Sequence, residues 1–325
     1  MAAVDAPAQM PETDDKRVPY HLQQRLPPWK LKDVRWAMGG YITAVHVLAL
    51  FGLTYIAQAK AATLWWSFAL WLISGFGITG GAHRLWSHRS YTAGPIYRGL
   101  TMIANSIANQ GSIWHWSRDH RTHHFHSETV ADPHDAIRGF IFAHIGWLYL
   151  KKDKRVGEAG AKVNMDDLRL DGFVMFQKKW DPYWNILWCF AFPAIVASYG
   201  WGESGAVGFF VPGAVRYVWV LHMTWFVNSA AHLWGERPYD PKSNPAENPL
   251  VAIASIGEGW HNWHHKYPFD YAASEYGVLQ QFNPTKLIID FAAMCGSVTE
   301  RKRGTGMWKR ESIKLAEEAK KAKAM

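Results

Sequence analysis

Cysteine is scarce in this chain, and its scarcity limits how the fold can be held together. Only Cys189 and Cys295 occur among 325 residues, and Cys189 falls inside an apolar run. A disulfide framework is therefore excluded, and a reducing compartment is expected. The H-E-x-x-H motif of zinc proteases is also absent, which argues against that class of enzyme.

A dinucleotide-binding turn is excluded by context, although its glycine pattern is present. Gly75, Gly77 and Gly80 spell G-x-G-x-x-G, but this fingerprint binds phosphate only at a strand-to-helix turn within a βαβ unit. Here the glycines lie in an apolar segment without such a unit around them. We therefore interpret them as positions of close helix packing.

Long apolar segments dominate the chain, although its mean hydropathy of -0.19 averages them with polar loops. Four segments are long enough to cross a bilayer core of about 30 Å, namely 36–57, 61–82, 184–201 and 207–231. The sequence thus predicts an all-α integral membrane protein, with four transmembrane helices capped by a cytosolic helical domain. Arg216 and His222 lie in the fourth segment and are expected to face protein or water.

Composition divides the chain into a polar segment 1–35, a membrane domain 36–298 and a basic tail 299–325. The net charge is +8, and the basic residues flank the apolar segments, which indicates contact with anionic lipid headgroups rather than nucleic acid. Four spans would place both termini and the 83–183 segment on one side. These parts carry most of the Lys and Arg, so that side is expected to be cytoplasmic.

The chemistry is carried by histidine, of which the chain has sixteen. Nine stand in or beside compact motifs that follow apolar segments: His83, His88, His120, His123, His124, His232, His261, His264 and His265. Two motifs have i, i+3, i+4 spacing, which can turn three side chains to one side of a helix. Asn228 and His232 likewise share a helix face. His83 and His88 would be about 140° apart on an ideal α-helix, so we expect a helix end or distortion between them.

Imidazole is a ligand for iron, zinc, copper and nickel. Nine histidines and Asn228 are too many for one zinc ion, which takes four ligands, so two adjacent metal ions are the natural count. A histidine-rich site also differs from soluble di-iron bundles, in which Glu dominates. The remaining histidines are interpreted as satisfied polar or surface residues: His21, His46, His115, His126, His134, His144 and His222.

Several motifs resemble those of the acyl-CoA desaturases, in particular the stearoyl-CoA desaturase family. The resemblance runs from about Gly75 to Tyr276 and includes five stretches in order: GAHRLWSHRSY, WSRDHRTHH, SETVADPH, NSAAHLWGERPYD and GEGWHNWHHKYPFDYAASEY. It implies two iron ions held by the nine histidines, with Asn228 acting through a water molecule, and dioxygen as co-substrate. No catalytic residue beyond the metal ligands is implied.

The resemblance also implies substrate-binding residues. Acyl-CoA contacts fall near Arg118, Asp119, Lys151 and Lys152; an acyl tunnel falls near Gln110, Trp116, Thr224 and Trp225; its closed end falls near Trp71 and Gly75. Core packing is an equal alternative for Trp116 and Trp225, and Arg118 can equally pair with a carboxylate or a headgroup. Asp132, Glu258 and Glu275 are interpreted as carboxylates that orient the ligand imidazoles, as metal-bound histidines require.

The expected activity is oxygen-dependent desaturation of a long-chain saturated fatty acyl-CoA, with a cis double bond at the delta-9 position. Electrons are expected from a separate protein, cytochrome b5 with its reductase, and the location is the endoplasmic reticulum membrane with the active site and both termini cytoplasmic. Three alternatives stay open: an acyl-lipid desaturase of other regioselectivity, a histidine-box hydroxylase, and a catalytically silent metal-binding membrane protein.

Overall fold

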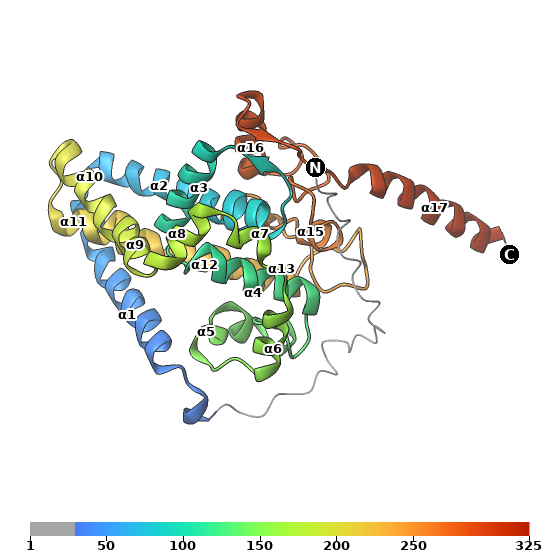
Figure 1. The fold of residues 1–325 in the computed structure, drawn as a ribbon, viewed down its shortest axis with the longest axis horizontal. Coiled ribbons are helices and arrows are strands. Elements are labelled where there is room, and N and C mark those ends of the chain that lie inside the picture. The colour runs from blue at the N-terminus through green and yellow to red at the C-terminus, as the bar shows by residue number, and fades with distance from the viewer. Residues whose placement is uncertain (1–29, 325) are drawn as a thin grey trace.

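A computed structural model describes residues 30–324, and regular structure in this part of the chain is almost entirely helical (Figure 1). The one pair of strands within that range is β1 (Thr92–Ala93) and β2 (Val298–Thr299), which are antiparallel with Thr92 opposite Thr299. Most of the predicted segment 1–35, together with His21, lies outside the described residues.

Among the described residues, three helices are long and apolar enough to cross a membrane: Trp36–Gln58, Ala61–Ser87 and Gly205–Leu233. The first joins α1 (Trp36–Gly52) to η3 (Leu53–Gln58), and the second joins α2 (Ala61–Phe76) to the π-helix η4 (Gly77–Ser87). The third consists of α11 (Gly205–Phe209), η8 (Phe210–Val215), α12 (Arg216–Asn228) and α13 (Ala230–Leu233). Bulky apolar side chains of α1 and α2, such as Leu50, Phe51 and Trp65, are exposed, as expected for a surface that faces lipid.

The predicted span 184–201 is helical but is not among these three. It comprises α9 (Tyr183–Ile186), η7 (Leu187–Ala191) and α10 (Phe192–Trp201), and α10 packs on α11 and α2. Polar and helix-disturbing residues within it, including Asn185, Pro193 and Ser198, lower its hydropathy. The chain is thus mostly helical with apolar helices, and the count of four spans stays a prediction.

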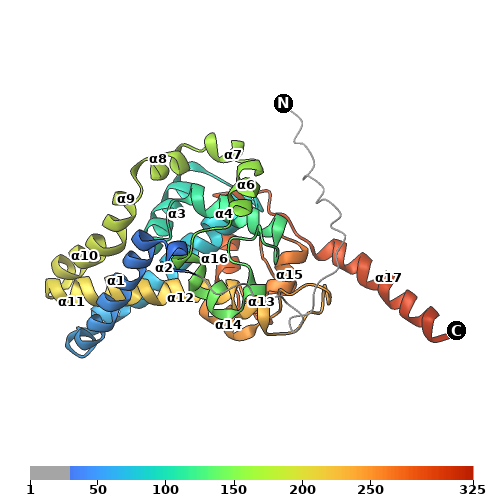
Figure 2. The same ribbon diagram turned by 90° about the horizontal axis from the view of Figure 1, so that it is seen from below.

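The other helices include those that carry the remaining histidine motifs, and these lie away from α10 and α11, toward the side from which the C-terminal helix projects (Figures 1 and 2). The other helices are η2 (Leu31–Asp33), α3 (Pro95–Ala108), α4 (Ile113–His126), η5 (Ala136–Arg138), η6 (Phe142–Gly146), α5 (Trp147–Tyr149), α6 (Lys154–Lys162), α7 (Asp166–Arg169), α8 (Gly172–Trp180), α14 (Pro249–Ala254), α15 (His261–Lys266), α16 (Pro284–Met294) and α17 (Thr305–Ala324). Both views show α17 projecting away from the remaining helices.

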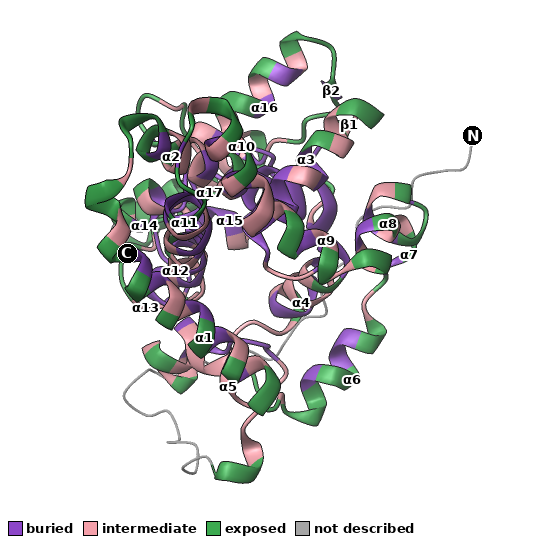
Figure 3. Ribbon diagram, turned by 90° about the vertical axis from the view of Figure 1, so that its left-hand side faces the viewer, coloured by how far each residue is buried: buried purple, intermediate pink, exposed green. Residues whose placement is uncertain are grey.

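The buried core lies around η4, which packs against α3, α4 and α16. All eleven residues of η4 are buried, and Figure 3 shows buried segments in the interior with exposed ones on the outer helices. A Cβ atom on Gly77 would lie 2.1 Å from the backbone nitrogen of Asn105, so only glycine allows η4 and α3 to approach this closely. The interpretation of the glycine motif as helix packing is therefore confirmed at Gly77.

Candidate metal centre

A π-helical turn brings His83 and His88 together. The backbone N–H of His88 donates to the carbonyl of His83 at 3.1 Å, which is the i to i+5 bond of a π-helix. The wider turn rotates the two side chains toward one another, and their ring centroids are 4.9 Å apart. The expected distortion between these residues is confirmed.

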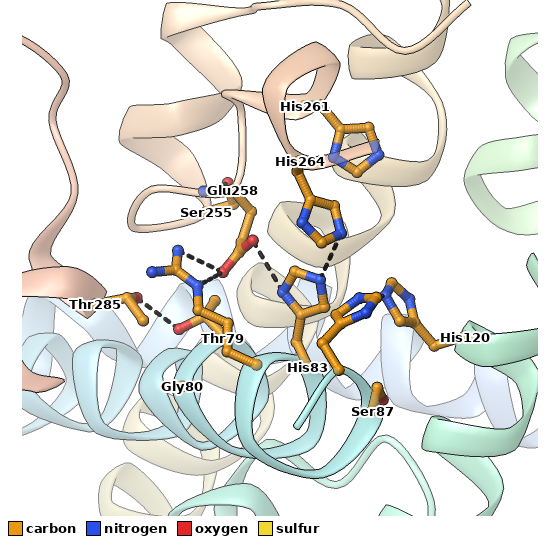
Figure 4. A network of polar contacts seen from close by, with 12 residues as sticks. Thr79, Gly80, His83, Ser87, His120, Ser255, Glu258, His261, His264 and Thr285 are labelled. Atoms are coloured by element: carbon orange, nitrogen blue, oxygen red, sulfur yellow. Dashed lines mark hydrogen bonds and ion pairs between the residues drawn. The ribbon is translucent and has the colours of Figure 1, made fainter. Parts of the chain in front are cut away.

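One group of five histidines forms around this turn. It contains His83, His88, His120, His124 and His264, and one ring nitrogen from each lies within 4.8 Å of all the others. These five residues, the five-histidine group, come from η4 and its C-terminal end, α4 and α15. The Nε2 atoms of His88 and His120 are 2.7 Å apart. Those of His83 and His264 are 2.9 Å apart, as Figure 4 shows by a dashed line.

A second group of four lies beside the first. It contains His123, His232, His261 and His265, whose nitrogens also lie within 4.8 Å of one another. In this four-histidine group, Nε2 of His261 is 3.0 Å from that of His232 and 3.1 Å from that of His265. Asn228, at the end of α12, lines the same cavity as His120, His123 and His261. All nine predicted histidines therefore converge, in two groups.

The helical motifs do not each serve one group. His120 and His124 belong to the five-histidine group, whereas His123 belongs to the other; likewise His261 and His265 part from His264. Residues four apart stay together and the residue between them turns away, because neighbouring helix positions differ by about 100°. Each motif points toward the site, since His120 and His123 line the same cavity, but it contributes to both groups.

The donor set fits metal ions. Ring nitrogens that face one another at these distances cannot all be donors, and the carboxylates nearby lie on the opposite edges of the rings. Burial lowers the pKa of six histidines of the two groups that lie outside the membrane-length helices well below 6.5, and neighbouring histidines lower it further: His88, His120, His124, His261, His264 and His265. The neutral imidazole favoured by such a pKa is the form that binds metal.

Carboxylates orient several of these rings. Oε2 of Glu258 lies 3.0 Å from Nδ1 of His83, and its other oxygen accepts from the guanidinium of Arg84 at 2.8 Å. Figure 4 shows Glu258 and His264 on opposite sides of the His83 ring. Burial raises the pKa of the Glu258 carboxyl, but Arg84 and His83 lower it more, to about 2. The carboxylate therefore accepts the Nδ1 proton of His83 and turns Nε2 toward the five-histidine group.

Asp132 serves His123 in the same way, since both of its oxygens are 2.9 Å from Nδ1 of that ring. The interpretation of Glu275 was wrong, because this carboxylate accepts a hydrogen bond from the hydroxyl of Tyr239 at 2.7 Å. Glu128 takes the expected position instead, with Oε1 3.3 Å from Nδ1 of His232. In the sequence, the position of Glu128 in the SETVADPH stretch, four residues before Asp132, could have indicated this role.

An apolar cavity adjoins the two histidine groups. Trp71, Gly75, Trp116 and Thr224 line it together with His83 and His120. The amide of Gln110 donates to Thr224 at 2.8 Å and accepts from the indole N–H of Trp116 at 3.3 Å. Most predicted tunnel residues are thus brought together beside the histidines.

Trp225 is not among the residues that line this cavity. It is buried in a separate hydrophobic cluster with Tyr217 and Leu221 and stacks on the ring of His46, with centroids 6.1 Å apart. The alternative of core packing describes Trp225 better than tunnel lining.

The predicted acyl-CoA contacts form a charged cluster at the surface of α4. Asp119 accepts from Arg118 at 3.0 Å and from the ammonium of Lys152. Arg118 thus pairs with a carboxylate, which was one of its two alternatives. Lys151 is exposed, and its backbone N–H donates to the carbonyl of Asp33 at 2.7 Å.

Fold and site together define a mostly helical protein with apolar, membrane-length helices and two histidine groups able to hold metal ions. The model of the fatty acid desaturase family matches residues 61–277. The chain is 47% identical over 274 residues to stearoyl-CoA desaturase 5 of Bos taurus, covering 84% of this chain and 81% of that protein. It is 45% identical over 299 residues to the acyl-CoA Delta-9 desaturase of Acheta domesticus, covering 91% and 80%.

The acyl-CoA desaturase of Cyprinus carpio is 49% identical over 262 residues, which are 81% of this chain and 80% of that protein. The chain belongs to the fatty acid desaturase family.

Proposed function

We propose that this chain is an acyl-CoA desaturase of the membrane, which introduces a cis double bond at the delta-9 position of a long-chain saturated fatty acyl-CoA. The observation that carries the proposal is the position of an apolar, tryptophan-lined cavity beside two groups of histidines. The relatives named for stearoyl-CoA and Delta-9 desaturation support the substrate and the position of the double bond.

In this proposal one set of residues binds metal and another set binds substrate. The nine histidines would hold two iron ions, with Asn228 acting through water. Bound iron and dioxygen would supply the oxidising chemistry that unactivated C–H bonds require and that side chains do not provide. In balance, the saturated chain, dioxygen, two electrons and two protons give the alkene and two water molecules.

The cavity residues fix which carbons react. Trp71 and Trp116 line a cavity in which an alkyl chain can be buried, and aromatic walls stabilise such a chain while limiting its orientation. Thr224 offers a hydroxyl on the same wall, and this hydroxyl accepts a hydrogen bond from the amide of Gln110. Arg118, Lys151 and Lys152 carry positive charge suited to the phosphates of the coenzyme A group.

The chain's surroundings follow from this function. We place residues 36–298 in the desaturase domain, with four spans in the endoplasmic reticulum membrane and with both termini and the histidine groups cytoplasmic. Cytochrome b5, reduced by its reductase, would deliver the electrons as a separate protein. An acyl-lipid desaturase of other regioselectivity and a histidine-box hydroxylase are the alternatives.

Lipid profiling of a desaturase-deficient host tests the proposal. The intact chain should produce new delta-9 monounsaturated acids, and the His120→Ala, His124→Ala double variant should not. His126→Ala is the matched control, because His126 lies in the same helix but in neither histidine group. A hydroxylated product, or no new alkene at normal expression with an electron donor present, would contradict desaturation. Purified enzyme supplied with stearoyl-CoA or with stearoyl phospholipid separates the two kinds of substrate.

A further inference from the structure

Three histidines outside the two groups form a continuous chain of hydrogen bonds. Nε2 of His46 is 3.2 Å from Nε2 of His222, and Nδ1 of His222 is 2.9 Å from Nε2 of His144. At the ends, Nδ1 of His46 contacts the carbonyl of Ile42 at 2.7 Å, and Nδ1 of His144 contacts Oγ of Ser229 at 3.0 Å. The interpretation of these three histidines as satisfied polar residues is confirmed, and much of their hydrogen bonding is to one another.

This arrangement, the histidine chain, is not a third metal site. His222 offers opposite ring nitrogens to its two neighbours, so the three residues do not direct their nitrogens at one point. They instead link α1, α12 and η6, which are distant in sequence, to the single hydroxyl of Ser229.

The protons in the histidine chain have one consistent order. The Ile42 carbonyl can only accept, so Nδ1 of His46 carries a proton and its Nε2 accepts from His222. Nδ1 of His222 then accepts from Nε2 of His144, and Nδ1 of His144 accepts from the Ser229 hydroxyl. Three neutral imidazoles satisfy every contact in this order. Burial, and to a lesser extent His222, lowers the pKa of His144 to about 4, in agreement with a neutral ring.

Ser229 stands at the break between α12 and α13. It is fully buried, with φ −109° and ψ −73°, and its hydroxyl has a second possible acceptor in the Trp225 carbonyl at 2.8 Å. Asn228 directly precedes Ser229 in the chain. The backbone N–H of His232 donates to the carbonyl of Ser229 at 3.2 Å. The direction of this one hydroxyl therefore bears on two residues: Asn228, which lines the cavity beside both groups, and His232, which belongs to the four-histidine group.

We propose that the histidine chain holds Ser229 in place and thereby positions Asn228 and His232 to bind metal in the four-histidine group. His46, His222 and His144 are positioning residues that act through Ser229. The inference rests on the two-metal site of the proposed function, but it requires no particular substrate.

Replacement of His144 separates positioning from packing. His144→Leu removes the Nδ1 acceptor and leaves the Ser229 hydroxyl only the Trp225 carbonyl, while a side chain of similar bulk fills the space. His144→Asn keeps an acceptor near the position of Nδ1. With His144→Leu, metal affinity of the four-histidine group should fall by about 10- to 100-fold, the usual effect of losing a residue that orients a ligand, while the five-histidine group keeps its affinity. His144→Asn should restore most of the loss.

The measurement is anaerobic titration of the purified full chain in detergent with Fe²⁺, counting bound metal and resolving the two affinities. His115→Asn is the control, because His115 contacts Oγ of Ser112 and belongs to neither group. Equal loss at both groups, unchanged affinity in His144→Leu, or no rescue by His144→Asn would each overturn the inference. Two metal ions bound normally by a chain that forms no alkene would instead contradict the proposed function and leave this inference standing.

Discussion

Asp132 holds the ring of His123 with both carboxylate oxygens, each 2.9 Å from Nδ1. The same two oxygens accept the backbone N–H groups of Glu128 and His134 at 2.9 and 3.0 Å. The carboxylate thus fixes the direction of the ring and the loop that follows α4 at once.

Asp132→Asn should weaken metal binding by the four-histidine group. An amide nitrogen in place of one oxygen would face a backbone N–H, so the ring of His123 would lose its fixed orientation. Loss of such a partner lowers metal affinity by about 10- to 100-fold, which a metal titration of the purified chain would detect. Asp135→Asn is the matched control, because Asp135 accepts from the backbone of Ile137. Equal affinities in the two variants would contradict this role of Asp132.

The histidines that cluster could be predicted from sequence, but their division between two groups could not. Spacing identifies His120, His123 and His124 because imidazoles gathered within one helical turn have few other uses. The division depends on how α4 approaches α15, and this is set by packing over long sequence distances. The carboxylate partners show the same limit: Glu258 and Asp132 stand where expected, whereas Glu275 lies beside Tyr239.

The helical class was predictable because apolar runs of such length have few alternatives. The distortion at His83 could be inferred from the five-residue spacing to His88. The histidine chain could not be inferred from the sequence. His46, His144 and His222 are far apart in it and meet only when three elements pack together.

The metal-free chain should lose stability as the pH falls from 7.5 to 5.5. The six histidines whose pKa burial lowers stay neutral in the folded chain but take up protons below about 6.5 in the unfolded chain, so the unfolded state binds more protons. Each lowers the free energy of unfolding by up to about 1.4 kcal/mol per pH unit in that range. Asp135 and Glu247 act in the opposite sense, because their pKa values are raised by burial to about 7 and about 8.

Thermal melting in detergent at several pH values would check this expectation. Because the six histidines outnumber the two carboxyls, the melting temperature should rise as the pH rises. The His120→Ala, His124→Ala variant should show a shallower dependence, and a melting temperature that rises on acidification would contradict the argument.

Trp71 and Gly75 should set the preferred acyl chain length. A Cβ atom on Gly75 would lie 3.0 Å from Cδ1 of Ile256, so Gly75→Leu must fill part of the cavity and favour shorter chains. Trp71→Ala should open it and favour longer ones. Each methylene in an apolar pocket changes selectivity by about 10- to 200-fold, which competition between acyl-CoAs of different length would measure. Trp65→Ala, an exposed tryptophan of the same helix, should leave the length profile unchanged.

Arg216 should be needed for stability rather than for charge balance. Its guanidinium is buried in the third membrane-length helix and donates to the carbonyls of Pro212, Ile107 and Cys189 at 2.8 to 2.9 Å. These carbonyls come from η8, α3 and η7, so one side chain joins three elements. Arg216→Met removes every donor at once, and each buried acceptor left unpaired costs about 1–3 kcal/mol.

The melting temperature of Arg216→Met in detergent should therefore fall well below that of the intact chain, whereas Arg155→Met, at an exposed ion pair with Asp153, should change it little. A carboxylate introduced beside Arg216 in the intact chain should not raise the melting temperature, because the guanidinium already donates to three carbonyls. An unchanged melting temperature in Arg216→Met would mean that water replaces the lost donors, and that the junction of η8, α3 and η7 is open to solvent.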